Sequence, residues 1–253
     1  MGDVPVSVMI IAKNEESRIE DCLQSVAFAK EILLIDDMST DRTVEIAKRY
    51  SAKIFQRKMD NEGRQRNFGY EKATQPWILS LDADERVTPE LEKEIASVCA
   101  DPDDPHTCYA VPVKTFIGRT WISGAGYYPS ARAKFFRAGR FRYEEAGVHP
   151  RAIYQGSSGR FRGDLLHYSA KDFGHWLSKF NRETTLEAEK WVTDGRKVSL
   201  GNSLRKTADR FLKNYFLKQG IKTGFPGFLM SVFHGMYQLV TYAKYREAKR
   251  PGL

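Results

Sequence analysis

The first eighty residues alternate short apolar runs with amphipathic stretches, and this alternation constrains the fold more than any other feature of the sequence. The apolar runs lie at 6–12, 31–37, 52–56 and 77–84, and the amphipathic stretches between them lie at 16–28, 41–50 and 61–74. The first set predicts strands and the second predicts helices. Strands that are apolar on both sides suit a parallel sheet with helices on both faces. The sequence therefore predicts an α/β fold.

After residue 89 the alternation loosens. The pattern predicts a helix that ends near Cys99, strands at 108–116 and 131–137, and a further helix at 173–194. We expect a mixed sheet in this part, and we expect it to carry the second substrate. Residues 1–195 are predicted to form one domain, and residues 196–253 are predicted to form a helical appendage.

The appendage is strongly basic. Residues 196–253 contain 12 Lys+Arg and 2 Asp+Glu, a net charge of +10, so the preceding residues carry −2 because the whole chain carries +8. A basic tail is typical of binding to nucleic acid or to an anionic membrane surface, and it also occurs as a solvated face.

Acidic side chains follow the predicted strands. In an open parallel sheet, ligands bind beyond the carboxyl ends of the strands. Glu15 follows the first strand, Asp36 and Asp37 follow the second, and Asp82 and Asp84 follow the fourth. Two carboxylates at the end of one strand can share a divalent cation that bridges the phosphates of a nucleotide diphosphate, although the same pattern also occurs in ordinary turns.

Four motifs occur in the first ninety residues, and three further segments occur later in the chain. The motifs are Val8 to Glu16, Asp36 to Asp41, Glu62 to Asn67 and Leu81 to Glu85; the later segments are Gly147 to Pro150, Leu166 to Ser169 and Lys179 to Arg182. The motifs resemble, in order and spacing, those of family 2 glycosyltransferases with a GT-A fold. The later segments resemble the branch that contains the lipopolysaccharide-core β-1,4-glucosyltransferases.

The resemblance implies roles for the matching positions. Three residues are implied to hold the uridine of a UDP-sugar, and two more to line the donor side. The paired aspartates are implied to contact the ribose and a Mg²⁺ or Mn²⁺ ion. Asp84 is the implied metal ligand, and Asp82 faces the ribose or the metal. The uridine residues are Ala12, Glu15 and Asp37, and the residues that line the donor are Arg66 and Asn67.

Members of this class invert the anomeric centre in a single displacement, so a base must take the proton from the acceptor hydroxyl. The candidates are Glu144, Glu145 and His149, of which Glu145 is preferred. The related branch has His followed by Glu where this chain has His149 and Pro150, so the choice of base stays open. For each glutamate, an exposed loop charge is the alternative.

Three further residues are candidates for the diphosphate and the metal. His167 follows two leucines, so it is either a core histidine or a group that completes the coordination of the metal. Lys179 and Arg182 lie three residues apart on a predicted helix and therefore share a face, where they could neutralise the diphosphate. Arg182 also resembles an arginine in a helical motif that closes over the donor in related transferases.

The appendage contains an uncharged run at 224–243. This run is long enough for a transmembrane helix, but its apolar residues recur at helical spacing and its small and polar residues fall largely opposite. With basic residues on both sides, the pattern fits a helix on an anionic membrane surface. Packing of the apolar stripe on the catalytic domain or on a second subunit is an equal alternative.

Together these features predict a metal-dependent inverting glycosyltransferase. We expect it to move a sugar, glucose being the first candidate, from a UDP-sugar to a lipid-linked glycan such as the lipopolysaccharide inner core. Residues 1–100 would form the nucleotide-sugar half and residues 101–195 the acceptor half. Transfer to a polyprenyl phosphate is an alternative within the same class.

Two other classes are less consistent with the sequence. A nucleotidyltransferase would need a glycine-rich phosphate loop after the first strand, which residues 12–16 lack. A nucleic-acid-binding protein would use the basic tail, but the tail has no recognisable binding module. The three cysteines lack metal-site spacing and predict reduced thiols, and the N-terminus lacks a signal peptide, so we expect a cytoplasmic protein attached to the inner membrane face.

Overall fold

The structure is a computed structural model that describes residues 2–145 and 151–249. The chain forms two compact units. Unit 1 comprises residues 1–113 and 131–167, and unit 2 comprises residues 114–130 and 168–253. This division by compactness does not test the predicted functional boundary at residue 195, which stays a prediction.

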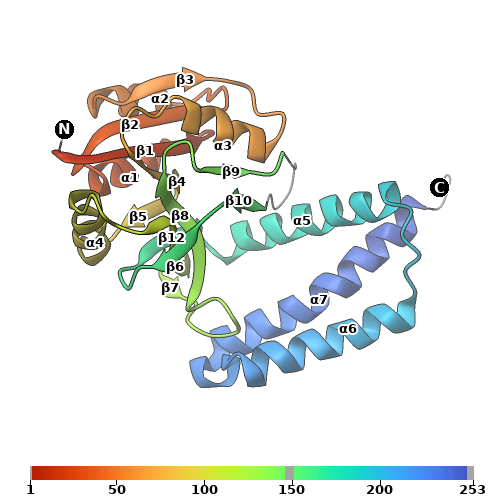
Figure 1. Cartoon of the computed structure of the whole chain (residues 1–253). Coiled ribbons are helices and arrows are strands. Elements are labelled where there is room, and N and C mark those ends of the chain that lie inside the picture. Colours follow the sequence, from red (N-terminus) through yellow and green to blue (C-terminus); the bar gives the residue numbers. More distant parts are fainter. Residues whose placement is uncertain (1, 146–150, 250–253) are drawn as a thin grey trace. The chain divides into compact units, whose positions relative to one another are not determined.

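Unit 1 begins with four parallel strands in the order β3-β2-β1-β4. These strands are connected by α1 (Ile19–Ser25), α2 (Thr43–Arg49) and α3 (Glu62–Glu71) (Figure 1). Their bounds are β1 (Val4–Ala12), β2 (Ala29–Asp36), β3 (Lys53–Gln56) and β4 (Trp77–Asp82). The predicted α/β alternation is confirmed.

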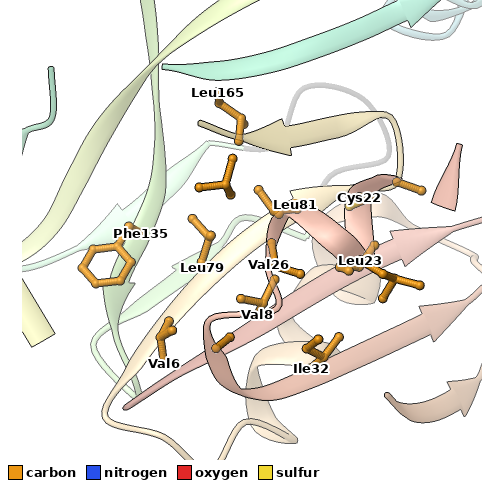
Figure 2. Close-up of a cluster of buried hydrophobic side chains, with 14 of the residues drawn as sticks. Val6, Val8, Cys22, Leu23, Val26, Ile32, Leu79, Leu81, Phe135 and Leu165 are labelled. Carbon is orange, nitrogen blue, oxygen red and sulfur yellow. The ribbon is translucent and has the colours of Figure 1, made fainter. Parts of the chain in front are cut away.

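The two faces of this sheet are covered by different helices, because side chains alternate along each strand. Val6, Val8 and Ile10 of β1 pack with residues of α1, α2 and the later helix α4 (Pro89–Ala100). Met9, the residue between Val8 and Ile10, packs on the opposite side with Tyr70 of α3. Figure 2 shows the first of these cores, with Leu23 of α1 beside the strand residues.

The later strands convert the parallel sheet into a mixed one, as predicted. β4 pairs antiparallel with β8 (Ser130–Arg137), and the order continues through β6 (His106–Ile117) and β12 (Leu165–Ala170) to β5 (Glu85–Val87). β11 (Ser157–Arg160) pairs with β6, and β9 (Phe141–Tyr143) forms a separate ribbon with β10 (Ala152–Tyr154). The sequence pattern did not predict β9, β10 or β11.

Unit 2 is mainly helical. It contains β7 (Thr120–Trp121), α5 (Phe173–Thr193), α6 (Leu200–Leu212) and α7 (Gly224–Ala248). The connection from α6 to α7 consists of two short helical turns, η1 (Lys213–Leu217) and η2 (Gly220–Thr223). α7 packs against both α5 and α6 (Figure 1). Within residues 2–145 and 151–249, no helix combines the length and the apolar character that crossing a bilayer requires.

The buried residues of α7 are small and polar ones together with Met230, Tyr242 and Tyr245, so the predicted apolar stripe does not supply the main packing surface. Gly227, Ser231, Gly235, Gln238 and Thr241 are buried. At Gly235 a Cβ atom would lie 2.8 Å from the backbone oxygen of Thr207, so α6 approaches closely because the side chain is absent. Apolar residues of the stripe, including Phe225, Phe228 and Met236, stand exposed instead.

The three cysteines are free, as predicted. Cys22 and Cys108 are buried, and Cys99 is partly buried. Burial raises the pKa of each thiol, and that of Cys99 reaches about 12. These side chains therefore contribute to packing rather than to thiolate chemistry.

Candidate functional site

The ends of β1 and β2 hold a buried carboxylate. The N–H of Asp37 donates to the carbonyl of Ala12 at 2.8 Å, which joins the two strand ends. The Asp37 side chain accepts from the Met59 N–H at 2.7 Å and from Lys13 Nζ at 2.9 Å. Burial opposes the charge of Asp37, but these two donors outweigh it and hold the pKa of the carboxyl below its usual value.

The loops that follow β1 and β2 are tied together by hydrogen bonds. The N–H of Asn14 donates to Ser39 Oγ at 2.9 Å, and the N–H of Thr40 donates to Asn14 Oδ1 at 2.8 Å. The N–H of Glu15 donates to Thr43 Oγ1 at 2.8 Å. The predicted uridine residues Ala12, Glu15 and Asp37 therefore lie on adjoining, mutually fixed strand ends.

Asp82, at the end of β4, is held by two cationic side chains. Its Oδ1 accepts from Arg66 Nη2 of α3 at 2.8 Å, and its Oδ2 lies 3.2 Å from Lys134 Nζ of β8. Lys134 also contacts Glu85 Oε2 at 2.7 Å, and both of these side chains are buried. Burial opposes the charge of Asp82, but Arg66 and Lys134 outweigh it and hold the pKa of Asp82 well below its usual value.

Asp84 faces the imidazole of His167, which comes from β12. The distance from Asp84 Oδ2 to His167 Nε2 is 3.5 Å, and Arg18 Nη1 lies 3.5 Å from the same oxygen. The register of β5 with β12 brings His167 to this position, because His167 is opposite Glu85. Both Asp84 and His167 are largely buried, so the structure joins two residues that the sequence singled out separately.

The pair of Asp84 and His167 fits a divalent cation. Their separation of 3.5 Å exceeds a good N–H···O hydrogen bond, which is about 2.9–3.0 Å. The nitrogen of His167 that faces Asp84 is Nε2, so Nε2 and the Asp84 carboxylate are the two groups that could share an ion. Within the same residues, no group of three or more His, Cys, Asp or Glu side chains forms a metal site. Two protein ligands leave the remaining positions to substrate phosphates and water, which is typical of Mg²⁺ and related ions.

Helix α3 links this cluster to the predicted bases. Arg66 contacts Asp82, while Arg64, on the same helix, contacts Glu145 Oε2 through Nη2 at 3.1 Å. The helix approaches this segment closely, since a Cβ atom at Gly63 would collide with the carbonyl oxygen of Glu144. Asn67 uses its side-chain amide to pair with the backbone of Tyr143, donating at 2.9 Å and accepting at 2.8 Å.

The two glutamates predicted as bases are paired but solvent-accessible. Glu145 is 54% exposed beside Arg64, and Glu144 is 44% exposed with its Oε2 3.3 Å from Arg151 Nε. Their exposure leaves both carboxylates accessible to an acceptor hydroxyl. The third candidate, His149, lies outside the described residues.

Lys179 and Arg182 lie on α5 in unit 2, whereas the carboxylate cluster belongs to unit 1. Lys179 Nζ donates to the carbonyl of Ser169 at the end of β12, and Arg182 is exposed. Their predicted contact with a donor diphosphate stays a prediction.

Comparison with protein families decides the class. Residues 7–152 match the family described as glycosyl transferase family 2, and this segment is more than half of the chain. The chain belongs to glycosyl transferase family 2. The family resemblance predicted from the motifs is confirmed, and the protein is a glycosyltransferase.

Relatives of this glycosyltransferase extend over nearly its whole length. It is 26% identical to the lipopolysaccharide core biosynthesis glycosyltransferase LpsC of Rhizobium meliloti, over 95% of this chain and 92% of the relative. It is 27% identical to an uncharacterized glycosyltransferase of Rickettsia typhi, over 96% and 87% of the two chains. The name of LpsC agrees with the branch that the motifs indicated.

A solved structure confirms the predicted GT-A fold of the glycosyltransferase. The mannosyltransferase PcManGT from Pyrobaculum calidifontis, in complex with GDP-Man and Mn²⁺, has a TM-score of 0.51 and 13% sequence identity, over 97% of this chain and 88% of that chain. At this identity the likeness concerns the fold alone.

Two residues in the cluster of the glycosyltransferase were not predicted from the sequence. Lys134 and Arg18 contact the paired aspartates from distant parts of the chain, whereas Glu85 belongs to the fourth motif. The position of Lys134 directly before Phe135 and Phe136 in a predicted strand is the signal that could have identified it, because a lysine buried beside such residues needs an anionic partner.

Proposed function

We propose that this glycosyltransferase moves a hexose, glucose being the first candidate, from a UDP-sugar to a lipid-linked glycan. The transfer is metal-dependent and inverts the anomeric centre. The observation that carries the proposal is the meeting of Asp37, Asp82, Asp84 and His167 at the strand ends of one sheet. In open α/β sheets this edge is where nucleotides bind.

The donor would lie along the ends of β1, β2 and β4. Asp37 is ionised and fixed by two donors, so its carboxylate can accept hydrogen bonds from the edge of the uracil ring. Ala12 and Glu15 would complete the nucleoside site. The charge of Asp82 is balanced by Arg66 and Lys134, and a metal ion bound to Asp82 would have to compete with these two side chains. We therefore assign Asp82 to accept hydrogen bonds from the ribose hydroxyls.

Asp84 and His167 would hold the cation. Asp82 would be at most a weaker third ligand, because its carboxylate already contacts Arg66 and Lys134. PcManGT, which shares the fold, binds GDP-Man together with Mn²⁺, and this supports a divalent cation here. A bound Mg²⁺ or Mn²⁺ would supply positive charge to the departing diphosphate. Arg18, 3.5 Å from Asp84, adds a fixed cation beside the same position. From unit 2, Lys179 and Arg182 would add further charge to the diphosphate.

A carboxylate near α3 would take the proton from the acceptor hydroxyl. We retain Glu145 as the first candidate, because Arg64 keeps it oriented while half of its surface faces solvent. Glu144 has a similar pairing with the more exposed Arg151 and is the second candidate. His149 remains the third. Asn67 would act by positioning β9, which leads into these residues.

The proposed acceptor is a glycan on a membrane lipid, the lipopolysaccharide inner core being the specific candidate. Support comes from the name of LpsC, which matches this chain over nearly its full length. The enzyme would work on the cytoplasmic face of the inner membrane, as a peripheral protein attached through its basic C-terminal helices. Transfer to a polyprenyl phosphate would instead yield a lipid-extractable, acid-labile product.

The donor site is tested by calorimetric titration of UDP, UDP-glucose and GDP, each with and without Mn²⁺ or Mg²⁺. We expect metal-dependent binding of UDP and UDP-glucose, with weaker binding of GDP. Asp84→Asn should abolish the metal dependence. Asp209→Asn, an exposed change in unit 2, is the matched control and should bind as the wild type does.

Metal-independent UDP binding that Asp84→Asn leaves intact would contradict the metal assignment. Failure of the folded wild type to bind UDP under any metal condition would overturn the proposed donor. Tighter binding of GDP would overturn the nucleotide choice and leave the reaction class standing.

A further inference from the structure

The connection between α6 and α7 exposes a cluster of large apolar side chains, which we name the apolar tip. It comprises Leu212, Phe216, Leu217, Ile221, Phe225 and Phe228. Leu217 and Phe225 are 78% and 71% exposed, the highest fractions among the large hydrophobic residues that the structure describes. A cluster of exposed apolar side chains of this size marks an interaction site.

The apolar tip is held by packing beneath it. The rings of Phe211 and Tyr215 stack at 5.5 Å between centroids, and Phe228 meets Tyr215 edge-on at 5.8 Å. Gly220 is buried against Asn214 and Ser231. The exposed side chains therefore project from an ordered turn.

Only basic charges accompany the apolar tip. The segment 210–243 contains Arg210, Lys213, Lys218 and Lys222 and has no Asp or Glu. The three lysines are exposed. Exposed apolar residues mixed with cations, without any carboxylate, complement an anionic lipid surface, because the apolar groups can enter the acyl boundary while the ammonium groups stay at the phosphates.

A hollow of about 530 Å³ adjoins the apolar tip, and Leu217 belongs to both. Its other polar and cationic lining includes Lys218, Lys222, Tyr128, Ser123 and Thr223. The side chain of Lys218 lies across Gly126, since a Cβ there would be 2.8 Å from its Nζ. None of the lining residues is acidic, so the hollow presents two ammonium groups and several hydroxyls to an anion.

The far end of α7 offers less to a membrane. Lys244, which the sequence placed on the basic flank, directs its Nζ at Asn181, Thr184 and Thr185 of α5, at 2.6–2.8 Å. This lysine joins two helices. Arg246 and Lys249 at the same end are exposed, but the exposed large hydrophobic residues of α7 are Phe225, Phe228 and Met236. Exposed apolar and basic side chains therefore occur together at the α6–α7 connection.

We propose that the hollow binds the phosphate headgroup of an anionic phospholipid while the apolar tip enters the lipid layer. This inference deepens the membrane attachment in the proposed function and rests on it for the location of the acceptor. Lys218 and Lys222 contact the phosphate, and Leu217, Ile221 and Phe225 contact the acyl chains. The membrane face of the protein is then one end of unit 2.

Flotation of the full chain with vesicles tests the proposal. We expect binding to vesicles of phosphatidylglycerol mixed with phosphatidylcholine, weak binding to phosphatidylcholine alone, and weakening by added NaCl. The double variant Lys218→Gln, Lys222→Gln should lose affinity by about tenfold or more, since each basic residue at such a surface contributes about 1 kcal/mol. Leu217→Ser with Phe225→Ser should lose binding at every lipid composition.

The matched control is Lys197→Gln with Lys206→Gln, which removes the same charge from exposed positions of the tail that do not line the hollow. An equal loss in both lysine pairs would overturn the hollow as a site. Absence of binding by the wild type to anionic vesicles would overturn the membrane face. Binding of inorganic phosphate at the hollow without vesicle binding would replace the lipid by a free anion.

UDP titration on the same variants separates this inference from the proposed function. Vesicle binding by a wild type that does not bind UDP would leave the lipid site standing and overturn the donor assignment. Loss of vesicle binding with unchanged UDP binding and unchanged circular dichroism would locate the defect in unit 2.

Discussion

Asp82 divides its two carboxylate oxygens between Arg66 and Lys134, which come from a helix and a strand far apart in the sequence. Lys134 is buried together with Glu85, so the cluster depends on charge balance rather than on hydration. Asp84 has a different environment, with an imidazole and a guanidinium each at 3.5 Å. Two aspartates separated by one residue thus have different protein partners.

Lys134→Met tests the charge balance. We expect the free energy of unfolding to fall by about 3–5 kcal/mol, because Asp82 and Glu85 lose a buried cationic partner. Urea denaturation measures the change. Arg205→Met removes the cation of an exposed pair with Asp209 and should cost at most about 1 kcal/mol. Equal effects of the two substitutions would show that the buried cluster contributes no more than a surface pair.

Helices and strands of the first eighty residues could be predicted because their signals are local. Apolar runs alone placed β1, β2, β3 and β4 to within about two residues, and the edge where Asp37, Asp82 and Asp84 gather followed from the strand ends. β9, β10 and β11 were missed because they are only three or four residues long and are defined by their partners.

The site was predicted less completely than the fold. Lys134 and Arg18 reach Asp82 and Asp84 from other elements, and no sequence spacing records these contacts. The α7 pattern identified a helix but left open whether its apolar stripe packs inside the protein or faces a membrane. Gly235 and Ser231 are buried where the helices pack closely, while Phe225, Phe228 and Met236 of the stripe are exposed.

The close packing of α6 and α7 predicts that alanine has opposite effects on stability at Gly235 and at Gly201. Gly235→Ala should destabilise unit 2 by about 1–3 kcal/mol, because the new methyl group would press on the Thr207 carbonyl and force the helices apart. Gly201→Ala, in α6, has no atom within 4 Å of the added group and should stabilise by up to about 1 kcal/mol. Thermal unfolding of both variants provides the comparison, and destabilisation by both would contradict it.

Helix α7 also contains a histidine that makes the stability of the protein depend on pH. Burial, together with repulsion from Lys218 and Arg210, lowers the pKa of His234 from 6.5 to about 4. The unfolded chain takes up a proton near pH 6.5 while the folded chain stays neutral, so stability falls as the pH drops from 6.5 towards 4. Between pH 7 and 5 the loss from this residue is about 2 kcal/mol.

His234→Gln should remove that part of the pH dependence in urea unfolding at pH 7 and pH 5. His106→Gln, which changes a histidine of unit 1, should retain it. If His234→Gln loses as much stability on acidification as the wild type, the imidazole is already protonated in the folded protein or is solvated there.

At the scale of the whole molecule, unit 2 combines two separate stretches of sequence. Ile117, Ile122 and Ala125 from the first stretch share a core with Ala170 and Met230 from the second. Trp191 and Ala188 of α5 pack with Tyr242 and Tyr245 of α7. Among residues 2–145 and 151–249, the hydrophobic cores of unit 1 use none after Leu165.

Deletion of residues 196–253 should therefore damage unit 2 and spare the core of unit 1. We expect the shortened chain to bind a hydrophobic dye and to self-associate, because Trp191 and Ile122 lose buried surface. Dye fluorescence and size-exclusion chromatography measure these effects. A monodisperse shortened chain with no dye binding would contradict the shared core.

The shared core of unit 2 also limits which segments can be swapped between family members in chimeric proteins. A hybrid that receives only residues 168–253 from another family member would set foreign helices against the native Ile117, Ile122 and Ala125. Such a hybrid needs residues 114–130 from the same donor to restore complementary packing. Successful recombination therefore requires paired crossovers on both sides of the intervening strands, and the two stretches should be inherited together.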